Sequence, residues 1–267
     1  MPTLAGSPDA LGEVGRPADD TIELSRLEER LPPLLSVIAG MVDLTGFFTL
    51  GNIFTAHITG NLVVAAAAAV HGGPWNLAQA LAIPVFMLAV AAAWLVARAS
   101  SLHGTALTRL LLVIQFLLLG AVLVFCVTTE PSANPHGLMA GIAVMVAVCA
   151  MAFQYALLRL ALPKAVSTAV MTGNLTNAVL SMMEMLSPQQ PLMTVDRGRL
   201  KRSLYLLIGF LVGCLVAAAA ISMLGDWAWS IPTALAAVAI AVRRPNCFGV
   251  WLRSKSSSIC RAPSWPN

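Results

Sequence analysis

The four residues Thr59-Gly60-Asn61-Leu62 recur as Thr172-Gly173-Asn174-Leu175, 113 residues later in a chain of 267. Both copies lie within otherwise apolar sequence, where glycine permits a backbone turn and asparagine favours the start of a helix. A repeated break of this kind is typical of two equivalent halves that each contain one interrupted membrane helix. The repeat therefore predicts a duplicated architecture.

Charged residues are too sparse for an ordinary soluble domain, at 10% of the chain against about 25% in typical globular proteins. They are also clustered, so that Asp43 is the only acidic or basic residue between Arg30 and Arg98. The intervals between charges hold runs of about 20 apolar residues, enough for a helix to cross a bilayer. These runs lack the alternation of a membrane barrel. Eight candidate segments follow, over 33–51, 54–70, 77–97, 110–127, 138–158, 168–186, 204–224 and 227–242.

The positions of the 16 Lys and Arg residues discriminate between two topologies. If all eight segments cross with the N-terminus inside, 12 basic residues lie on the inner face and 4 on the outer face. If the two segments with the Thr-Gly-Asn motif enter and return on one side, six segments cross and all 16 lie inside. Basic residues in short loops gather on the cytoplasmic face, so we favour six crossings and keep eight as the alternative.

The expected protein is an all-α integral membrane protein with two repeats, over about 33–128 and 137–242. Each repeat would contain three spanning helices and one short or re-entrant Thr-Gly-Asn helix. Three crossings per half give the second half the opposite orientation, which is the layout of an inverted repeat. A GxxxG spacing at Gly209 and Gly213 predicts a close helix-packing face.

Both ends of the chain are expected outside the membrane, on the cytoplasmic side. Residues 1–30 are rich in polar residues and are predicted to be a disordered tail. Within this tail, residues 21–31 could form a short helix that stops at Pro32 and Pro33. Residues 243–267 are basic and rich in Ser, which predicts a second cytoplasmic tail.

Asp43 lies about ten residues from either end of its apolar segment. A carboxylate at that depth is costly and usually serves a proton or cation pathway, or pairs with a buried donor. We favour the first interpretation, with Asp43 as a candidate proton-coupling residue, and keep a structural hydrogen bond to His57 or Asn61 as the alternative. His57 can itself titrate near neutral pH.

The Thr-Gly-Asn motif allows two interpretations. A helix that starts at Asn61 or Asn174 would direct its free N–H groups toward the membrane interior, where they could hold an anion or a polar substrate group. Alternatively, the motif is a packing seam of small residues with a hydrogen-bonded Asn. The candidate substrate- or ion-binding residues are Asp43, His57, Thr59, Gly60, Asn61, Gln154, Thr172, Gly173 and Asn174.

The sequence contains no catalytic motif, and its four histidines are dispersed, so we expect neither an enzyme nor a metal or other cofactor. The net charge of +4 is explained by cytoplasmic loops, which leaves nucleic-acid binding without support. The expected partners are the lipid bilayer and an unidentified small solute, and a homo-oligomer is left open. The predicted function is secondary transport with proton coupling. The alternatives are a passive channel or facilitator and a non-transporting scaffold or sensor.

Several motifs resemble those of the YoaK-like (DUF1275) family of bacterial membrane proteins, over about residues 35–242. They are Gly40-x-x-Asp43, Phe54-Thr55-Ala56-His57-Ile58-Thr59-Gly60-Asn61 and Met171-Thr172-Gly173-Asn174. The resemblance implies a multi-pass protein of the bacterial plasma (inner) membrane without an established activity. The second half of the family usually carries Gly-x-Gln-Asn, whereas here Ala152-Phe153-Gln154-Tyr155 keeps only Gln154. This departure argues against equal polar ligands from the two halves.

Overall fold

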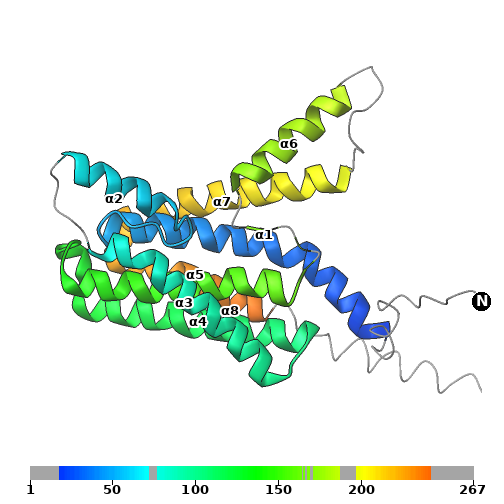
Figure 1. Ribbon diagram of the computed structural model, residues 1–267, viewed down its shortest axis with the longest axis horizontal. Helices are drawn as coiled ribbons and strands as arrows, with labels where there is room; N and C mark the ends of the chain where they lie inside the picture. Colours follow the sequence, from blue (N-terminus) through cyan, green and yellow to red (C-terminus); the bar gives the residue numbers. More distant parts are fainter. Residues whose placement is uncertain are drawn as a thin grey trace, which may run out of the picture.

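The computed structural model describes residues 18–71, 77–163, 165, 167–168, 171–186 and 197–241, and all regular structure in these ranges is helical (Figure 1). The prediction of an all-α fold is confirmed, whereas residues 1–17 and 243–267 of the predicted tails lie outside the described part. The helices are α1 (Ala18–Thr49), α2 (Gly60–His71), α3 (Leu77–Ser100), α4 (Gly104–Thr129), α5 (Leu138–Leu160), α6 (Met171–Leu186), α7 (Arg197–Leu224) and α8 (Ser230–Ala241). Two short 3-10 turns, η2 (Pro131–Ala133) and η3 (Gly225–Trp229), precede α5 and α8.

Five stretches of the described chain are helical, long and apolar enough to cross a membrane. They are Arg26–Thr49, Leu77–Ser100, Gly104–Thr129, Leu138–Leu160 and Leu200–Ala241. The last stretch has 42 residues and would be about 63 Å long as one straight helix, twice the hydrocarbon thickness of about 30 Å. It is divided at Gly225, whose φ of 55° lies in the left-handed region that glycine tolerates. Several crossings are therefore available, as in a multi-pass membrane protein.

The long helices alternate in direction. In Figure 1, α1, α4 and α7 run from right to left, and α3, α5 and α8 run from left to right. The central helices are α1 and α5, which bury most of their apolar residues, whereas α3 and α7 bury few of theirs. The core consists largely of Leu, Ala and Val from α1, α4 and α5.

Contacts between helices follow a regular pattern. Helix α1 packs along α7, and α5 packs along α3; α2 contacts α3, and α6 contacts α7. Helix α5 also packs on α4, and α1 on α8, while α4 and α8 contact each other.

The prediction that a short helix stops at Pro32 and Pro33 is wrong, because α1 continues through both prolines. Residues 18–30 of the predicted disordered tail are also helical. Proline removes a helical hydrogen bond and normally breaks a helix. Here Leu31 and Pro32 are buried, and Gly209 of α7 lies against the carbonyl of Pro33. Tertiary packing of this kind outweighs the local preference.

The two Thr-Gly-Asn helices are short and differ from the others in position. Both α2 and α6 begin near the middle of the molecule, and they diverge toward its opposite ends (Figure 1). Helix α2 starts at Gly60, six residues later than the predicted segment, because residues 50–59 form an irregular loop.

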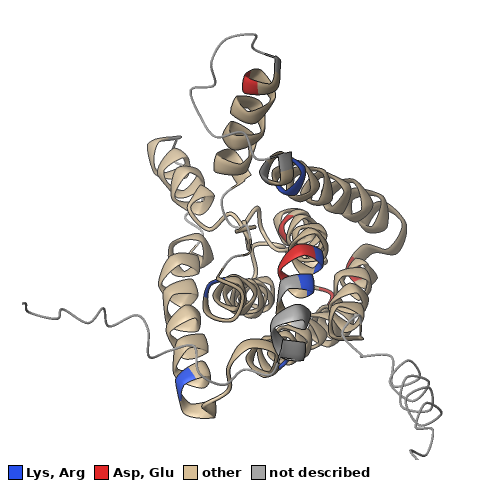
Figure 2. Cartoon of the chain, turned by 90° about the vertical axis from the view of Figure 1, so that its right-hand side faces the viewer, with Lys and Arg blue, Asp and Glu red and all other residues tan. Residues whose placement is uncertain are grey.

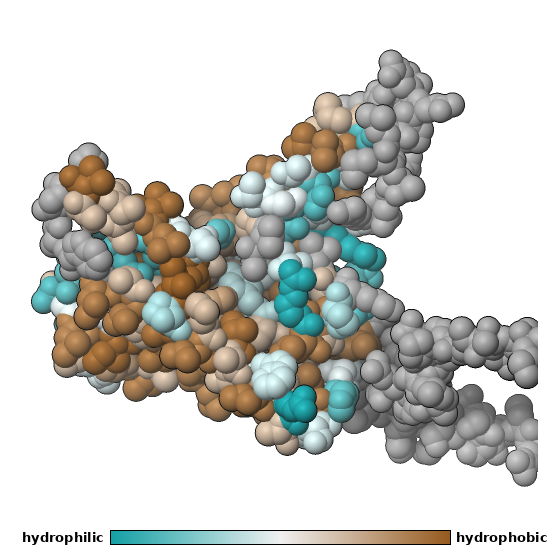
Figure 3. Space-filling model, in the orientation of Figure 1, coloured by the Kyte–Doolittle hydropathy of each residue, from teal (hydrophilic) through white to brown (hydrophobic). Residues whose placement is uncertain are grey.

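The surface separates apolar and basic residues. Apolar side chains cover most of the face in Figure 3, and hydrophilic residues gather toward its right-hand end. Lys and Arg occur in the starts of α1, α4 and α7 and in the ends of α3 and α5. These helix ends all lie at the right-hand end of Figure 1, which faces the viewer in Figure 2. At the other end, Asp226 accepts a hydrogen bond of 2.6 Å from Ser132.

Candidate functional site

Helix α1 ends in a turn that sends the chain back along the helix. Gly51 and Asn52 have φ values of 85° and 60°, and the N–H of Asn52 donates to the carbonyl of Phe47 at 3.0 Å. This is the Schellman arrangement, in which a left-handed glycine ends a helix. The following loop returns to the level of Asp43, well inside the apolar part of α1.

Asp43 holds this returning loop through its backbone. Its Oδ1 accepts hydrogen bonds from the N–H groups of Thr55 at 2.7 Å and Ala56 at 2.8 Å. The carboxylate is 4% exposed, so these donors replace water around it. A buried carboxylate needs such donors, and a broken helix has free N–H groups that need an acceptor. Each group therefore satisfies the other.

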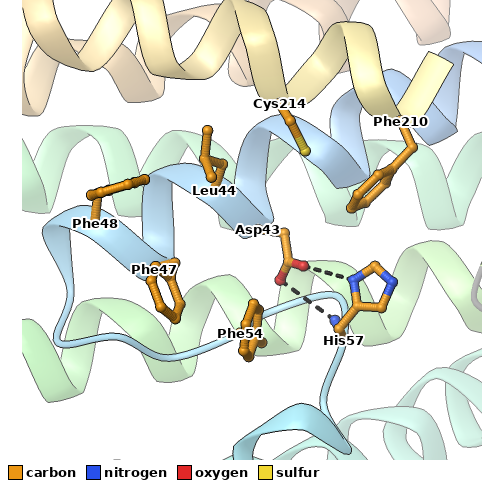
Figure 4. Close-up of a pocket in the computed structure, with 8 residues that line it drawn as sticks. All are labelled: Asp43, Leu44, Phe47, Phe48, Phe54, His57, Phe210 and Cys214. Carbon is orange, nitrogen blue, oxygen red and sulfur yellow. Dashed lines mark hydrogen bonds and ion pairs between the residues drawn. The ribbon is translucent and has the colours of Figure 1, made fainter. Parts of the chain in front are cut away.

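The second oxygen of Asp43 pairs with His57. Oδ2 lies 2.7 Å from Nδ1 of His57 (Figure 4), and this contact is an ion pair when the imidazole is protonated. An ionised carboxylate only accepts hydrogen bonds, so the proton between the two groups belongs to Nδ1. Among the described residues, Nε2 of His57 has no hydrogen-bond partner, and the side chain is 37% exposed. Nε2 is therefore the ring nitrogen that this pair leaves unoccupied.

Asn61 fastens the other end of the loop to the start of α2. Its side-chain oxygen accepts from the N–H of Phe54, and its side-chain N–H donates to the carbonyl of Phe54, both at 2.8 Å. Asn61 is fully buried, whereas Thr59 is exposed and Gly60 lies against the Phe54 ring.

The expectation that the start of α2 offers free N–H groups to an anion is wrong for its first three residues. The N–H groups of Gly60, Asn61 and Leu62 donate to the carbonyls three residues earlier, at 2.8, 3.1 and 3.2 Å. Bonds of this 3-10 type often satisfy the donors at a helix end. The positive end of α2 is thus occupied by its own chain.

Tyr155 of α5 supports the loop from the opposite side. Its hydroxyl donates to the carbonyl of Ala56 at 3.1 Å. Ala56, the residue directly before His57, therefore has its N–H held by Asp43 and its carbonyl held by Tyr155.

The second copy of the motif repeats one of these interactions. Asn174 is 4% exposed and donates to the carbonyl of Ser167 at 2.9 Å, seven residues earlier, as Asn61 does to Phe54. Thr172 is exposed and Gly173 is partly buried, and neither lines the cavity described below. The buried hydroxyl of Thr168, which matches Thr55, has no hydrogen-bond partner among the described residues. In the described part of the chain, the carboxylate–imidazole pair belongs to the first half alone.

A cavity of about 320 Å³ adjoins the Asp43–His57 pair. It lies between α1, the loop and α7, and most of its wall is aromatic (Figure 4). The ring centroids of Phe47 and Phe54 are 4.8 Å apart, and those of His57 and Phe210 are 5.0 Å apart. Its wall is formed by Asp43, Leu44, Phe47, Phe48, Phe54, His57, Phe210 and Cys214.

The close approach of α7 brings Phe210 and Cys214 to the cavity. A side chain at Gly40 would overlap the backbone of Phe210, and one at Gly213 would overlap the backbone of Val37. The GxxxG prediction of a close packing face is confirmed. Ser36 of α1 strengthens the contact by donating to the carbonyl of Leu206 at 2.6 Å.

Gln154 lies away from this cavity. It is buried between helices, where its amide N–H donates to the carbonyl of Leu35 at 2.9 Å and its oxygen accepts from Gln115 at 2.7 Å. This arrangement joins α1, α4 and α5. Of the predicted site residues, only Asp43 and His57 line the cavity, while Asn61 and Gly60 shape it through Phe54.

Sequence reasoning missed the aromatic wall of the cavity. Phe210 and Cys214 each follow a glycine of the GxxxG pattern, so that pattern was the available signal. Phe47, Phe48 and Phe54 flank the break after α1 and gave no separate signal. Within the described residues, no group of three or more His, Cys, Asp or Glu is arranged to hold a metal ion.

Comparison with known proteins identifies the family. A family model described as "Protein of unknown function (DUF1275)" matches residues 31–242, which is most of the chain and all of its described helices except the first 13 residues of α1. No curated protein and no solved structure matches the chain. The match covers the motifs around Asp43 and both Thr-Gly-Asn copies. The chain belongs to the DUF1275 family.

Proposed function

We propose that this protein is a secondary transporter of a small solute, and that the Asp43–His57 pair carries its coupling proton. The observation that carries the proposal is a buried carboxylate that holds a broken backbone segment and an imidazole beside a cavity. Ionisable residues at membrane depth usually mark ion or substrate pathways, and transporters build their sites at broken helices.

The proposed topology has six crossings, by α1, α3, α4, α5, α7 and α8. Exchanging α1 with α5, α2 with α6, α3 with α7, and α4 with α8 maps the contact of α1 with α7 onto that of α5 with α3, that of α2 with α3 onto that of α6 with α7, and that of α4 with α5 onto that of α8 with α1. The divergence of α2 and α6 toward opposite ends supports the same relation (Figure 1). The two motif helices would then enter the membrane from opposite sides, as in inverted-repeat transporters.

The charge distribution supports an orientation. The basic helix ends lie at one end of the molecule, which by the positive-inside bias is the cytoplasmic end. Both chain termini would then be cytoplasmic, in the bacterial plasma membrane that the family resemblance implies.

The proposed role of each group follows from the geometry. Asp43 is a fixed negative charge, because its Oδ1 is held by two backbone N–H groups and its Oδ2 by His57. His57 is the proton carrier, since Nδ1 is engaged and Nε2 is free to exchange. Protonation switches the pair from a net charge of −1 to zero. In a low-dielectric site that change is large enough to bias which solute can enter.

The test is reconstitution of the full chain into liposomes that contain a pH-sensitive dye. Pools of small amines, carboxylates and neutral solutes are added separately under a pH gradient, and internal pH is recorded. We expect one pool to move protons in wild-type vesicles and not in His57→Gln or Asp43→Asn vesicles. Thr176→Val is a matched control, because this exposed residue of α6 lies outside the cavity.

The alternatives give different results when solute uptake into the same vesicles is recorded together with internal pH. A passive channel would let a solute flow down its gradient without proton movement, and flux would persist in His57→Gln. A scaffold or sensor would move no solute from any pool. Either result would overturn proton-coupled transport.

A further inference from the structure

The cavity beside Asp43 has one fixed negative charge and no basic residue in its wall. Among its described lining residues, the only groups that can carry charge near neutral pH are Asp43 and His57. From the elements packed around this pair, α7 contributes Phe210 and Cys214, and α5 contributes the Tyr155 hydroxyl through Ala56. When His57 is neutral, the site therefore has an uncompensated charge of −1.

Four phenylalanine rings form most of the remaining wall, namely Phe47, Phe48, Phe54 and Phe210. The faces of aromatic rings attract cations, and the attraction grows when the site excludes water. A wall of this kind beside a carboxylate suits an organic cation with an apolar body. A hydrated metal ion would find too few oxygen ligands here.

The features that could have favoured an anion are occupied. The first N–H groups of α2 donate to their own loop, and those of Thr55 and Ala56 donate to Asp43. An anion would also lie beside the ionised carboxylate, which costs energy in a low-dielectric site. Only protonated His57 could offer it a donor, and that charge is already balanced by Asp43.

We infer that this cavity binds a small organic cation, such as a quaternary or protonated amine with an apolar body, in exchange for the proton on Nε2 of His57. The inference rests on the proposed function and specifies its substrate class. Charge balances in both states: either His57 is protonated beside Asp43, or His57 is neutral and the cation takes the place of that proton. The proton leaves to water when the cation enters, and no bond other than N–H is broken.

The size of the cavity sets the range of suitable cations. Its volume of about 320 Å³ lies at the lower end of small-molecule sites. Phenyltrimethylammonium is a suitable probe, because it combines one aromatic ring with one fixed positive charge that cannot lose a proton. Benzenesulfonate has the same aromatic ring with a negative charge. The compound tert-butylbenzene has the same ring and a substituent of the same shape, but no charge.

The test is isothermal titration calorimetry of the detergent-solubilised full chain with these three probes between pH 5 and pH 9. We expect phenyltrimethylammonium alone to bind, with affinity rising up to tenfold per pH unit while His57 titrates and then levelling off. In buffers of different ionisation enthalpy, binding should release about one proton at low pH and none at high pH. Binding of benzenesulfonate that strengthens at low pH, or binding of no probe, would overturn the inference.

Two variants separate the cation site from a folding defect. His57→Gln should retain binding but lose its pH dependence, because Asp43 keeps its charge. Phe210→Leu should bind about twofold to thirtyfold more weakly, the range expected for one ring face. Phe116→Leu in α4, outside the cavity, should bind as wild type. If His57→Gln keeps the wild-type pH dependence, the exchange with its proton is refuted.

Failure of the cation-binding inference can be distinguished from failure of the proposed transport function. If phenyltrimethylammonium binds as described but no solute pool moves protons in vesicles, the cation site stands and transport fails. If carboxylates move protons and the cation does not bind, transport stands and the cation inference fails.

Discussion

The contact of α1 with α7 should be unusually sensitive to a single added methyl group. At Gly40 and Gly213, a Cβ atom would overlap the backbone carbonyls of Phe210 and Val37, which cannot rotate away as a side chain would. At Gly209, a Cβ would lie 3.0 Å from the carbonyl oxygen of Pro33, which is a tight contact. At Gly120 of α4, nothing lies within 4 Å.

These distances predict a graded series of alanine variants. Gly40→Ala and Gly213→Ala should each destabilise the protein by about 1–3 kcal/mol, the usual cost of overpacking a tight contact. Gly209→Ala should cost less, because a shift of a few tenths of an ångström relieves it. Gly120→Ala is the matched control, and it should be stabilising by up to about 1 kcal/mol because alanine is the better helix former.

The assay is SDS-induced unfolding of the detergent-solubilised protein, followed by far-UV circular dichroism. Because the same helix movement displaces Phe210 and Cys214, Gly213→Ala should also weaken phenyltrimethylammonium binding, while Gly120→Ala should not. If Gly40→Ala and Gly213→Ala unfold at the same SDS fraction as Gly120→Ala, α1 and α7 are not in backbone contact. That result would remove two residues from the wall of the proposed site.

Three further predictions concern buried hydrogen bonds. Asn61→Ala should cost about 1–3 kcal/mol, because it leaves the N–H and the carbonyl of Phe54 without their side-chain partner; unfolding at the wild-type SDS fraction would contradict this. Tyr155→Phe should cost about 0.5–1.5 kcal/mol and shift the His57 imidazole signals in NMR spectra, and unchanged spectra would exclude its role in holding the loop. Gln115→Leu should cost about 1–3 kcal/mol by leaving the buried side-chain oxygen of Gln154 without its donor, and adding Gln154→Leu should restore part of that loss in a double-mutant cycle.

Much of the fold could be predicted because membrane helices are specified locally. Long apolar runs located α3 and α5 to within three residues, and α4 and α7 to within seven, since each run must satisfy its own backbone. The start of α1 was missed because the penalty of Pro32 and Pro33 is local, whereas the packing that offsets it comes from α7. The later start of α2 was missed for a related reason: its loop is held by Asp43 and Tyr155 from other helices.

The candidate site was predictable in its charges but not in its shape. Asp43 was conspicuous because a lone carboxylate in an apolar run is costly, and His57 followed from its position beside the motif. The Phe210 ring reaches the cavity only because α7 packs against α1. These two helices are distant in the sequence: Ser36 and Leu206, which share a hydrogen bond, are 170 residues apart. Gln154 was an equally reasonable candidate by sequence, and three-dimensional packing places it in a separate buried network.

The central claim is that the two Thr-Gly-Asn helices enter the membrane from opposite sides around the Asp43–His57 pair. Single cysteines at Val70, in the last turn of α2, and at Met185, in the last turn of α6, test it directly in a cysteine-free background, because both positions are exposed. With a membrane-impermeant maleimide, we predict that position 70 labels only from outside the cell and position 185 only from inside. Labelling of both positions from the same side would contradict the account.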